Sequence, residues 1–419
     1  MARPDDIRIS DLASPELTPI QLKIMEAAGG MSVEFTEEAV LAAACKATGL
    51  SDFGNDDFRE RLAIWLQAVD EDELLGPVGR IGVLRDITRY ATNRLRFEDL
   101  LRRHPEILEI EIERPIIIAG LPRSGTTHLL NLIAADRRLR SLPYWESIEP
   151  IPIPGEEPGP DGVDPRLARC RASYQQQDVM MPLLKNMHDL APEHVHEEIE
   201  LQGLDFSSYE LEWIATVPRW RDYYLEADQR SSYAYMKNVL RALQWMRGPS
   251  RWILKSPQHM EQLGPLMDTF PDATVAITHR DPVSVIASTV TMLVYGDRIR
   301  RKRVDPPAVA AYWIDRIERL LRSCVRDRDQ IPVERSIDVL FHEFMDDDLA
   351  MVRRIYELAD LEMSSEAEED LDAYMLANPR GKHGRIVYDL KGDFGVDRDE
   401  LRERFGFYFD RFPIEVEAH

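Results

Sequence analysis

Cysteine is scarce in this chain. Cys45, Cys170 and Cys324 are the only ones among 419 residues, and they are scattered and odd in number. A disulfide framework or a structural zinc site needs cysteines in even, regularly spaced sets. The composition therefore excludes a small disulfide-stabilised fold, and it predicts a protein of the reducing cytoplasm.

Long hydrophobic runs are also missing. A membrane-spanning helix needs roughly 18 or more apolar residues in succession, and no such run occurs. The first residues, Met1 to Asp6, lack the apolar core of a signal peptide. With 44% hydrophobic and 30% charged residues, we expect a soluble globular protein. Its length suits one large α/β domain with an appendage, or two domains.

Positive charge is in deficit. The chain has 52 Lys and Arg against 75 Asp and Glu, a formal net charge of −23. This balance disfavours nucleic acid or an anionic membrane as the main partner. An anionic ligand binds so acidic a protein only where basic side chains and helix N-termini are concentrated locally.

One stretch has the elements of such a site. Residues 116–119 form a β-branched apolar run of the kind that a parallel sheet buries on both faces. Gly120 and Gly125 bracket a short loop, and Thr126 and Thr127 open a helix. The first N–H groups of a helix lack internal partners and carry partial positive charge. A strand, loop and helix in this order attract a phosphate or another tetrahedral anion.

The spacing nearly matches the phosphate-binding loop G-x-x-x-x-G-K-[ST]. The mismatch is Thr126, which stands where the pattern needs Lys, whereas the cation is Arg123 inside the loop. An ordinary strand–turn–helix corner is the alternative interpretation. A basic residue and the hydroxyls of Ser124, Thr126 and Thr127 in one turn favour anion binding.

Strands and helices alternate along the rest of the chain. Apolar runs at 252–254, 273–278 and 336–341 read as short strands separated by helical patterns. This order predicts crossover connections and a mainly parallel sheet. We therefore expect an α/β fold, a three-layer, P-loop-like parallel sheet flanked by helices. We expect residues 1–112 to be a helical N-terminal extension or cap and residues 113–419 to be the α/β domain.

Basic residues follow three of the predicted strands. Arg123, Lys255 and Arg280 each stand at or just after a strand end. Ligands of parallel α/β sheets bind at the carboxyl ends of the strands. We expect these three cations to share one site. Asp281 and Pro282 are a good N-cap and first helical residue, so a helix should start directly after Arg280.

A second segment, residues 186–200, concentrates ionisable groups. In a helix, His196 and Glu200 would share a face at i,i+4, and so would His194 and Glu198. The H-E-x-x-H spacing of a zinc site is absent, and no Cys is near. The segment is either a solvated acidic helix or the source of a general base.

The loop Gly120-Leu121-Pro122-Arg123-Ser124-Gly125-Thr126-Thr127 resembles that of a known family, the sulfotransferases that use 3′-phosphoadenosine 5′-phosphosulfate. It is similar to the bacterial branch, which has Arg in the loop. The resemblance implies that this loop holds the 5′-phosphosulfate. It also implies that Arg280 and Ser288 hold the 3′-phosphate and that Lys255 lies near the transferred sulfuryl group. The basic residues Arg380 and Lys382 are similar to a late loop of the family that reaches the cofactor.

Sulfuryl transfer is an in-line displacement, in which an acceptor oxygen attacks sulfur while the 5′-phosphate leaves. The protein has to align the reactants and stabilise developing negative charge. The N–H groups of residues 124–128, ending at His128, suit the phosphosulfate together with Arg123. The compact charge of Lys255 suits the bridging oxygen, and no metal ion is needed.

The acceptor hydroxyl needs a base within hydrogen-bonding reach. His196 and Glu198 are the first candidates, with His188 and Glu197 behind them. We expect the acceptor to be a small molecule or a lipid. Two alternatives stay open: a P-loop nucleotide-dependent phosphotransferase, and a nucleotide-binding protein without catalysis.

Overall fold

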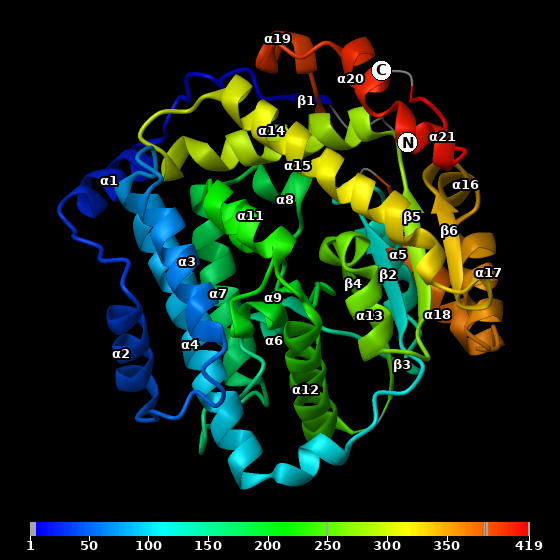
Figure 1. Cartoon of the computed structure of the whole chain (residues 1–419), viewed down its shortest axis with the longest axis horizontal. Coiled ribbons are helices and arrows are strands. Elements are labelled where there is room, and N and C mark those ends of the chain that lie inside the picture. The colour runs from blue at the N-terminus through cyan, green and yellow to red at the C-terminus, as the bar shows by residue number, and fades with distance from the viewer. Residues whose placement is uncertain (1–5, 249, 381, 383, 418–419) are drawn as a thin grey trace.

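The computed structural model describes residues 6–248, 250–380, 382 and 384–417. A five-stranded sheet in the order β3-β4-β2-β5-β6 lies in the right-hand half of Figure 1. All neighbouring strands pair in parallel, which confirms the predicted sheet. The strands are β2 (Ile116–Gly120), β3 (Leu139–Arg140), β4 (Arg251–Ser256), β5 (Thr274–His279) and β6 (Ser336–Leu340).

The two faces of the sheet are covered by separate sets of helices. Side chains alternate across a strand, and β2 is buried along its whole length. Ile116 and Ile118 pack with residues of α5, α17 and α18, whereas Ile117 and Ala119 pack with residues of α12 to α15. The three layers confirm the predicted α/β fold (Figure 1). These helices are α5 (Thr126–Ala134), α17 (Asp348–Leu358), α18 (Ser365–Ala377), α12 (Arg230–Arg247), α13 (Leu263–Thr269), α14 (Pro282–Arg300) and α15 (Pro306–Asp327).

The N-terminal helices share a core with the sheet. Ile87 and Tyr90 of α4 are buried in the same apolar cluster as Ile117 and Ala119. The division of the chain at residue 112 stays a prediction. A short strand, β1 (Asp6–Arg8), precedes the helices and pairs in parallel with β7 (Arg385–Val387). The helices, blue to cyan in Figure 1, are α1 (Pro19–Gly29), α2 (Glu37–Thr48), α3 (Phe58–Asp70) and α4 (Pro77–Arg103).

The remaining helices complete the described part of the chain, in which no helix is long and apolar enough to cross a bilayer. The α-helices are α6 (Tyr144–Ile148), α7 (Pro165–Met180), α8 (Leu184–Met187), α9 (Ile199–Gln202), α10 (Leu211–Ile214), α11 (Pro218–Glu226), α16 (Phe341–Asp346), α19 (Leu390–Phe394), α20 (Arg398–Arg404) and α21 (Gly406–Arg411). The 3-10 helices are η1 (Pro105–Glu109), η2 (Gly203–Asp205), η3 (Pro257–Glu261), η4 (Arg328–Gln330) and η5 (Val333–Arg335).

The structure does not form a helix over most of residues 194–200, so the helical interpretation of that stretch is wrong. Helix α9 begins only at Ile199. Before it, Val195 forms an antiparallel bridge with Pro143, and the N–H of His196 donates to the carbonyl of Leu142 at 2.8 Å. Because these tertiary hydrogen bonds hold the backbone extended, the i,i+4 faces expected around His196 do not form.

Candidate active site

The loop between β2 and α5 is tightly folded. A Cβ on Gly120 would lie 1.9 Å from Oγ1 of Thr278, so glycine lets β2 pack closely against β5. Gly125 has a φ of 86° and Arg123 a φ of 67°. A left-handed non-glycine residue costs about 1–3 kcal/mol and is found most often at functional sites. The left-handed backbone of Arg123 therefore makes this turn a candidate functional site.

The hydroxyl of Ser124 fixes the shape of this loop. Its Oγ donates to the carbonyl of Leu121 at 2.6 Å and lies 2.7 Å from Oγ1 of Thr278. Helix α5 begins directly afterwards at Thr126, with Gly125 as its N-cap. The first N–H groups of such a helix have no acceptor within the helix and favour an anion. The loop and helix start have the form that the sequence predicts.

The side chain of Arg123 links three segments that are distant in sequence. Its Nε donates to Oγ of Ser288 on α14 at 2.8 Å, and its Nη1 donates to the carbonyl of Met187. Oγ of Ser288 in turn donates to the hydroxyl of Tyr388 at 2.9 Å. Arg123 and Ser288 therefore meet, although 164 residues separate them in the chain.

Arg280 joins the same cluster from the end of β5. Its Nη1 donates to the carbonyl of Arg123 at 2.6 Å. Its Nε and Nη2 bind the two carboxylate oxygens of Glu417 at 2.6 and 2.7 Å. The guanidinium carbon lies 3.9 Å from the ring centre of Phe341. The guanidinium thus presents a planar fork that already holds an anionic group.

Asp281 sets the direction of the chain after Arg280. Its carboxylate accepts the N–H of Val283 at 2.9 Å as the N-cap of α14, and Pro282 is the first helical residue, as predicted. The other carboxylate oxygen accepts the N–H of Glu417 at 3.0 Å. The cap therefore also fixes the segment that places Glu417 on Arg280.

Lys255 lies at the end of β4, next to β2 in the sheet. Its side chain is 3% exposed, and its Nζ forms an ion pair with the carboxylate of Glu197. Burial raises the pKa of Glu197, while the nearby ammonium of Lys255 opposes that rise. A cation and a carboxylate of raised proton affinity therefore face each other in a buried position.

Glu198 is fully buried beside this pair. One carboxylate oxygen accepts the backbone N–H of Lys255 at 2.8 Å, and the other lies 2.6 Å from Nε2 of His259. Nδ1 of His259 is 2.8 Å from the hydroxyl of Tyr233. His259 and Tyr233 were not among the residues indicated by sequence. Sequence spacing does not reveal them, because 60 residues separate His259 from Glu198.

Two histidines lie near Lys255, the buried His196 and the half-buried His188. The ring centre of His196 is 4.7 Å from that of Tyr144 and 5.7 Å from that of His188. Burial lowers the pKa of His188 to about 3, helped by the positive charges of Lys255 and Arg123. Burial also lowers the pKa of His196 well below its ordinary range. Both imidazoles are therefore neutral at neutral pH and bind protons weakly.

The remaining indicated residues lie on the α17 side of α5. Arg380 pairs with Asp348, whose carboxylate also lies 3.2 Å from Nε2 of His128. Lys382 is exposed, and its neighbours 381 and 383 lie outside the described residues. Arg380 and His128 therefore both contact the carboxylate of Asp348, whereas Arg123 and Arg280 belong to the other cluster.

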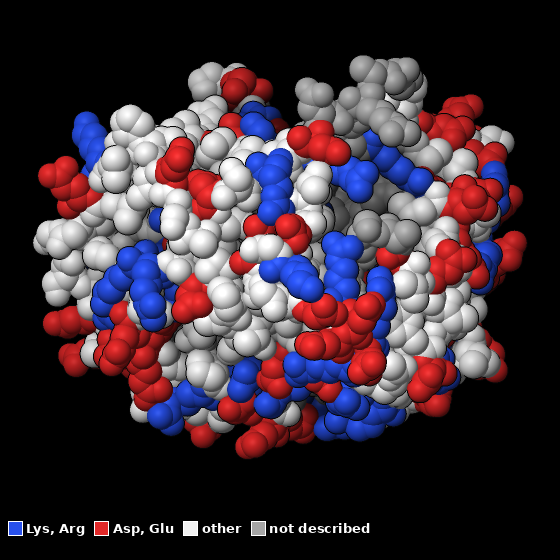
Figure 2. All heavy atoms as spheres, turned by 90° about the horizontal axis from the view of Figure 1, so that it is seen from above, with Lys and Arg blue, Asp and Glu red and all other residues white. Residues whose placement is uncertain are grey.

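Basic side chains gather at one place on the surface. Figure 2 shows acidic and basic side chains interspersed over the face seen from above, with Lys and Arg gathered around a hollow in its right-hand half. A local gathering of this kind is what an anionic ligand needs on a protein with a net charge of −23.

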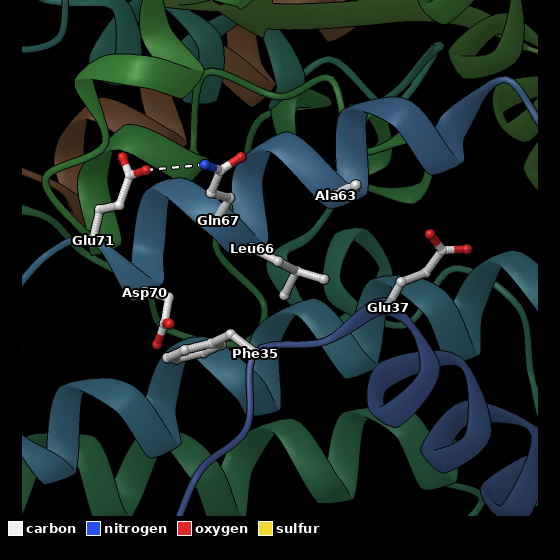
Figure 3. A pocket seen from close by; sticks show the side chains of 7 residues that line it. All are labelled: Phe35, Glu37, Ala63, Leu66, Gln67, Asp70 and Glu71. Carbon is white, nitrogen blue, oxygen red and sulfur yellow. Dashed lines mark hydrogen bonds between the residues drawn. The ribbon is translucent and has the colours of Figure 1, made fainter.

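A surface groove of about 370 Å³ lies elsewhere, on the N-terminal helices. Its acidic side chains are engaged: Glu37 pairs with Arg59, Asp70 with Arg80 and Glu71 with Arg219. We assign it no chemistry. Figure 3 shows its lining residues Phe35, Glu37, Ala63, Leu66, Gln67, Asp70 and Glu71.

The fold and the cluster define a class of protein: a parallel α/β protein with a tight glycine-bracketed loop before a helix N-terminus, cations at the carboxyl edge of its sheet, and a buried lysine beside a carboxylate. The sequence model of the sulfotransferase family matches residues 115–365, more than half of the chain. The chain belongs to the sulfotransferase family.

Two crystal structures of mycobacterial sulfotransferases are similar to this chain. Sulfotransferase STF1 from Mycobacterium tuberculosis H37Rv is 27% identical with a TM-score of 0.78, covering 89% of this chain and 98% of its own. Sulfotransferase STF9 from Mycobacterium avium is 29% identical with a TM-score of 0.81, covering 92% of this chain and 98% of its own. A comparison with curated proteins gives no match.

Proposed function

We propose that this protein transfers the sulfuryl group of 3′-phosphoadenosine 5′-phosphosulfate to a hydroxyl of a small-molecule or lipid acceptor and releases adenosine 3′,5′-bisphosphate. One observation carries the proposal. Arg123, Arg280 and Ser288 form a single hydrogen-bonded cluster beside the N-terminus of α5, and Lys255 lies at the end of the adjacent strand β4.

The carboxylate of Glu417 supports the fit of a phosphate to Arg280. It is held by two hydrogen bonds of 2.6 and 2.7 Å to the guanidinium fork, the geometry with which arginine also binds phosphate oxygens. We assign Arg280 and Ser288 to the 3′-phosphate, which would take the place of this carboxylate.

The loop and the start of α5 suit the other end of the donor. We assign the 5′-phosphosulfate to the N–H groups of residues 124–128, the hydroxyls of Thr126 and Thr127, and Arg123. The donor supplies an activated sulfuryl group on a good leaving phosphate. The protein's part is to hold it in line and to place the charge of Lys255 near the bridging oxygen.

Glu197 is the base that we favour for the acceptor hydroxyl. Its carboxylate contacts the ammonium of Lys255, and burial raises its pKa, which improves a carboxylate as a base near neutral pH. His196 is the second candidate, although its lowered pKa makes it a weaker base. Both oxygens of Glu198 already accept hydrogen bonds.

We place the reaction in the cytoplasm. Cys45, Cys170 and Cys324 are all free thiols in the structure, and two of them are buried. Free cysteines are typical of proteins in a reducing compartment.

Ligand-induced thermal shifts test the donor assignment. A ligand at 100 times its dissociation constant stabilises a fold by about 2.7 kcal/mol. We expect adenosine 3′,5′-bisphosphate to give the largest shift among the bisphosphate, ADP and ATP, without a requirement for magnesium. A larger shift with ATP and magnesium would instead support a phosphotransferase. Bisphosphate binding without turnover of any hydroxyl acceptor would support a binding protein.

A further inference from the structure

The backbone of Lys255 lies where the sheet loses a strand. Strand β3 pairs with β4 at Arg251 and Trp252 and ends there. Lys255 follows three residues later and is buried, and its N–H donates to the carboxylate of Glu198 at 2.8 Å. A buried N–H without an acceptor destabilises a fold. Glu198 therefore takes the place of a missing strand at the end of β4.

Glu198 is itself held from behind. Nε2 of His259 lies 2.6 Å from its second oxygen, and the hydroxyl of Tyr233 is 2.8 Å from Nδ1 of the same ring. The side chains of Glu198, His259 and Tyr233 are all 0% exposed. Burial raises the pKa of Tyr233 well above its ordinary value, so the phenol keeps its proton. In this row of three side chains, the Tyr233 O–H donates to Nδ1 of His259 and the Nε2–H of His259 donates to the carboxylate of Glu198. Both donors of the row are then satisfied.

The neighbour of Glu198 in sequence holds the other end of the lysine. Glu197 pairs with Nζ of Lys255, while Glu198 holds the backbone N–H of Lys255. Two successive carboxylates thus fix one lysine at its main chain and at its ammonium. Glu198 thus contacts one member of the Lys255–Glu197 pair through the Lys255 N–H and adjoins the other in sequence.

We propose that Glu198, anchored by His259 and Tyr233, is a positioning residue that sets the orientation of Lys255 and Glu197, and that it does not take the acceptor's proton. This inference rests on the proposed function for its catalytic consequence. It differs from the role of general base that the sequence suggests for Glu198.

Replacements of Glu198 separate geometry from proton transfer. In Glu198→Gln, the amide oxygen still accepts the N–H of Lys255. The amide nitrogen then donates a hydrogen bond to Nε2 of His259. This requires the other tautomer of the ring, in which Nδ1 carries the proton and donates a hydrogen bond to the hydroxyl oxygen of Tyr233. Glu198→Ala removes both acceptors. A positioning role therefore predicts rescue by Gln, whereas loss of a general base typically costs about 10²–10⁴-fold in rate.

The first test compares turnover of the two variants with an acceptor that the wild type uses. We expect kcat to fall less than about tenfold in Glu198→Gln and about 100-fold or more in Glu198→Ala. The acid limb of the kcat/KM profile should be unchanged in Glu198→Gln. A Gln variant as inactive as the Ala variant, with that limb lost, would make Glu198 the base and overturn the inference.

The second test does not depend on activity. Hydrogen–deuterium exchange of the peptide that contains residues 251–256 reports the Lys255 amide. We expect slow exchange in the wild type and in Glu198→Gln, and faster exchange in Glu198→Ala. Equal exchange in all three would contradict the anchor. If the wild type neither binds the bisphosphate nor transfers sulfate, the proposed function fails while this exchange result still decides the positioning.

A matched pair of tyrosine variants guards against general destabilisation. Tyr233→Phe removes the hydroxyl behind His259, whereas Tyr90→Phe removes a buried hydroxyl that contacts Glu200 at 2.9 Å. We expect only Tyr233→Phe to speed exchange at Lys255 and to lower kcat without changing bisphosphate affinity. Equal effects of both variants would overturn the anchored chain. If Glu198→Ala does not fold, this pair and Glu198→Gln carry the test.

Discussion

Charge is held differently on the two sides of the proposed site. The proposed donor side consists of Arg123, Arg280 and Ser288, and the proposed acceptor side consists of Lys255, Glu197 and the two histidines. On the donor side, Arg280 and its partner Glu417 have side chains that are 22% and 24% exposed, so a soluble anion is able to exchange for the carboxylate. On the acceptor side, Lys255 is 3% exposed and burial shifts the proton affinities of its neighbours. Under the proposed function, exposure suits the donor side to binding an exchangeable anion, and burial suits the acceptor side to controlling a proton.

Lys255→Ala should have the largest effect, because it should remove sulfuryl transfer and leave binding of the donor intact. Loss of a group that stabilises developing charge typically costs about 10²–10³-fold in kcat. We expect that loss here, with bisphosphate affinity unchanged, in steady-state kinetics and calorimetric titration. Lys237→Ala is the control, because Nζ of Lys237 donates to the carbonyl of Thr269 at 2.9 Å and lies 5.4 Å from the ring centre of Phe270, away from the proposed site. Equal weakening of bisphosphate binding and turnover in Lys255→Ala would place the lysine on the donor side.

Glu197→Gln should remove the proton acceptor and with it the acid limb of the pH profile. Because burial raises the pKa of Glu197, the carboxylate takes up a proton at a higher pH than an exposed glutamate. Activity of the wild type should therefore fall as the pH falls through that raised pKa. We expect Glu197→Gln to lose about 10²–10⁴-fold in kcat and to show no such limb. If the limb persists in Glu197→Gln and disappears in His196→Asn, the histidine is the base.

Ser288→Ala should weaken the donor side alone. Oγ of Ser288 accepts from Nε of Arg123 at 2.8 Å, and a hydrogen bond to a charged group contributes about 1.5–3 kcal/mol. We expect a loss of about tenfold or more in bisphosphate affinity by calorimetry, with little change in kcat at saturating donor. Thr291→Ala is the control on the same helix, because its hydroxyl bonds only to the helix carbonyl of Ala287. An unchanged affinity in Ser288→Ala would remove this serine from the site.

Glu417→Gln should have the smallest effect and the opposite sign. Its carboxylate occupies the fork of Arg280 and has to leave before a 3′-phosphate binds there. Partly exposed ion pairs contribute about 0.2–1 kcal/mol, so we expect bisphosphate to bind about twofold to fivefold more tightly and AMP to bind as before. Glu415→Gln is the matched control. Weaker bisphosphate binding in Glu417→Gln would show that this segment helps to form the site.

The donor side was largely predictable from sequence. The strand at 116–120, the turn at Gly125 and the cap at Asp281 are local features, and the parallel topology then brings Arg123 and Arg280 to one edge of the sheet. The assignment of Arg380 and Lys382 to the cofactor stays a prediction. In the structure, the guanidinium of Arg380 forms an ion pair with the carboxylate of Asp348.

The acceptor side was less predictable because its contacts are long-range. The extended backbone at His196 depends on a bridge from residue 143, and helical periodicity alone does not reveal it. The anchoring of Glu198 by His259 joins residues 61 positions apart. No local spacing encodes such pairs. They follow from how the helices cover the sheet.

A thermodynamic cycle tests whether Arg280 binds the 3′-phosphate of the donor. Calorimetric affinities of adenosine 3′,5′-bisphosphate and AMP are measured for the wild type and for Arg280→Ala, so that the cycle isolates the coupling between the guanidinium and the 3′-phosphate. We expect a coupling free energy of about 1.5–3 kcal/mol, with AMP bound almost equally by both proteins. A coupling near zero, or tighter binding of ATP with magnesium than of the bisphosphate, would contradict a phosphosulfate donor site at Arg280.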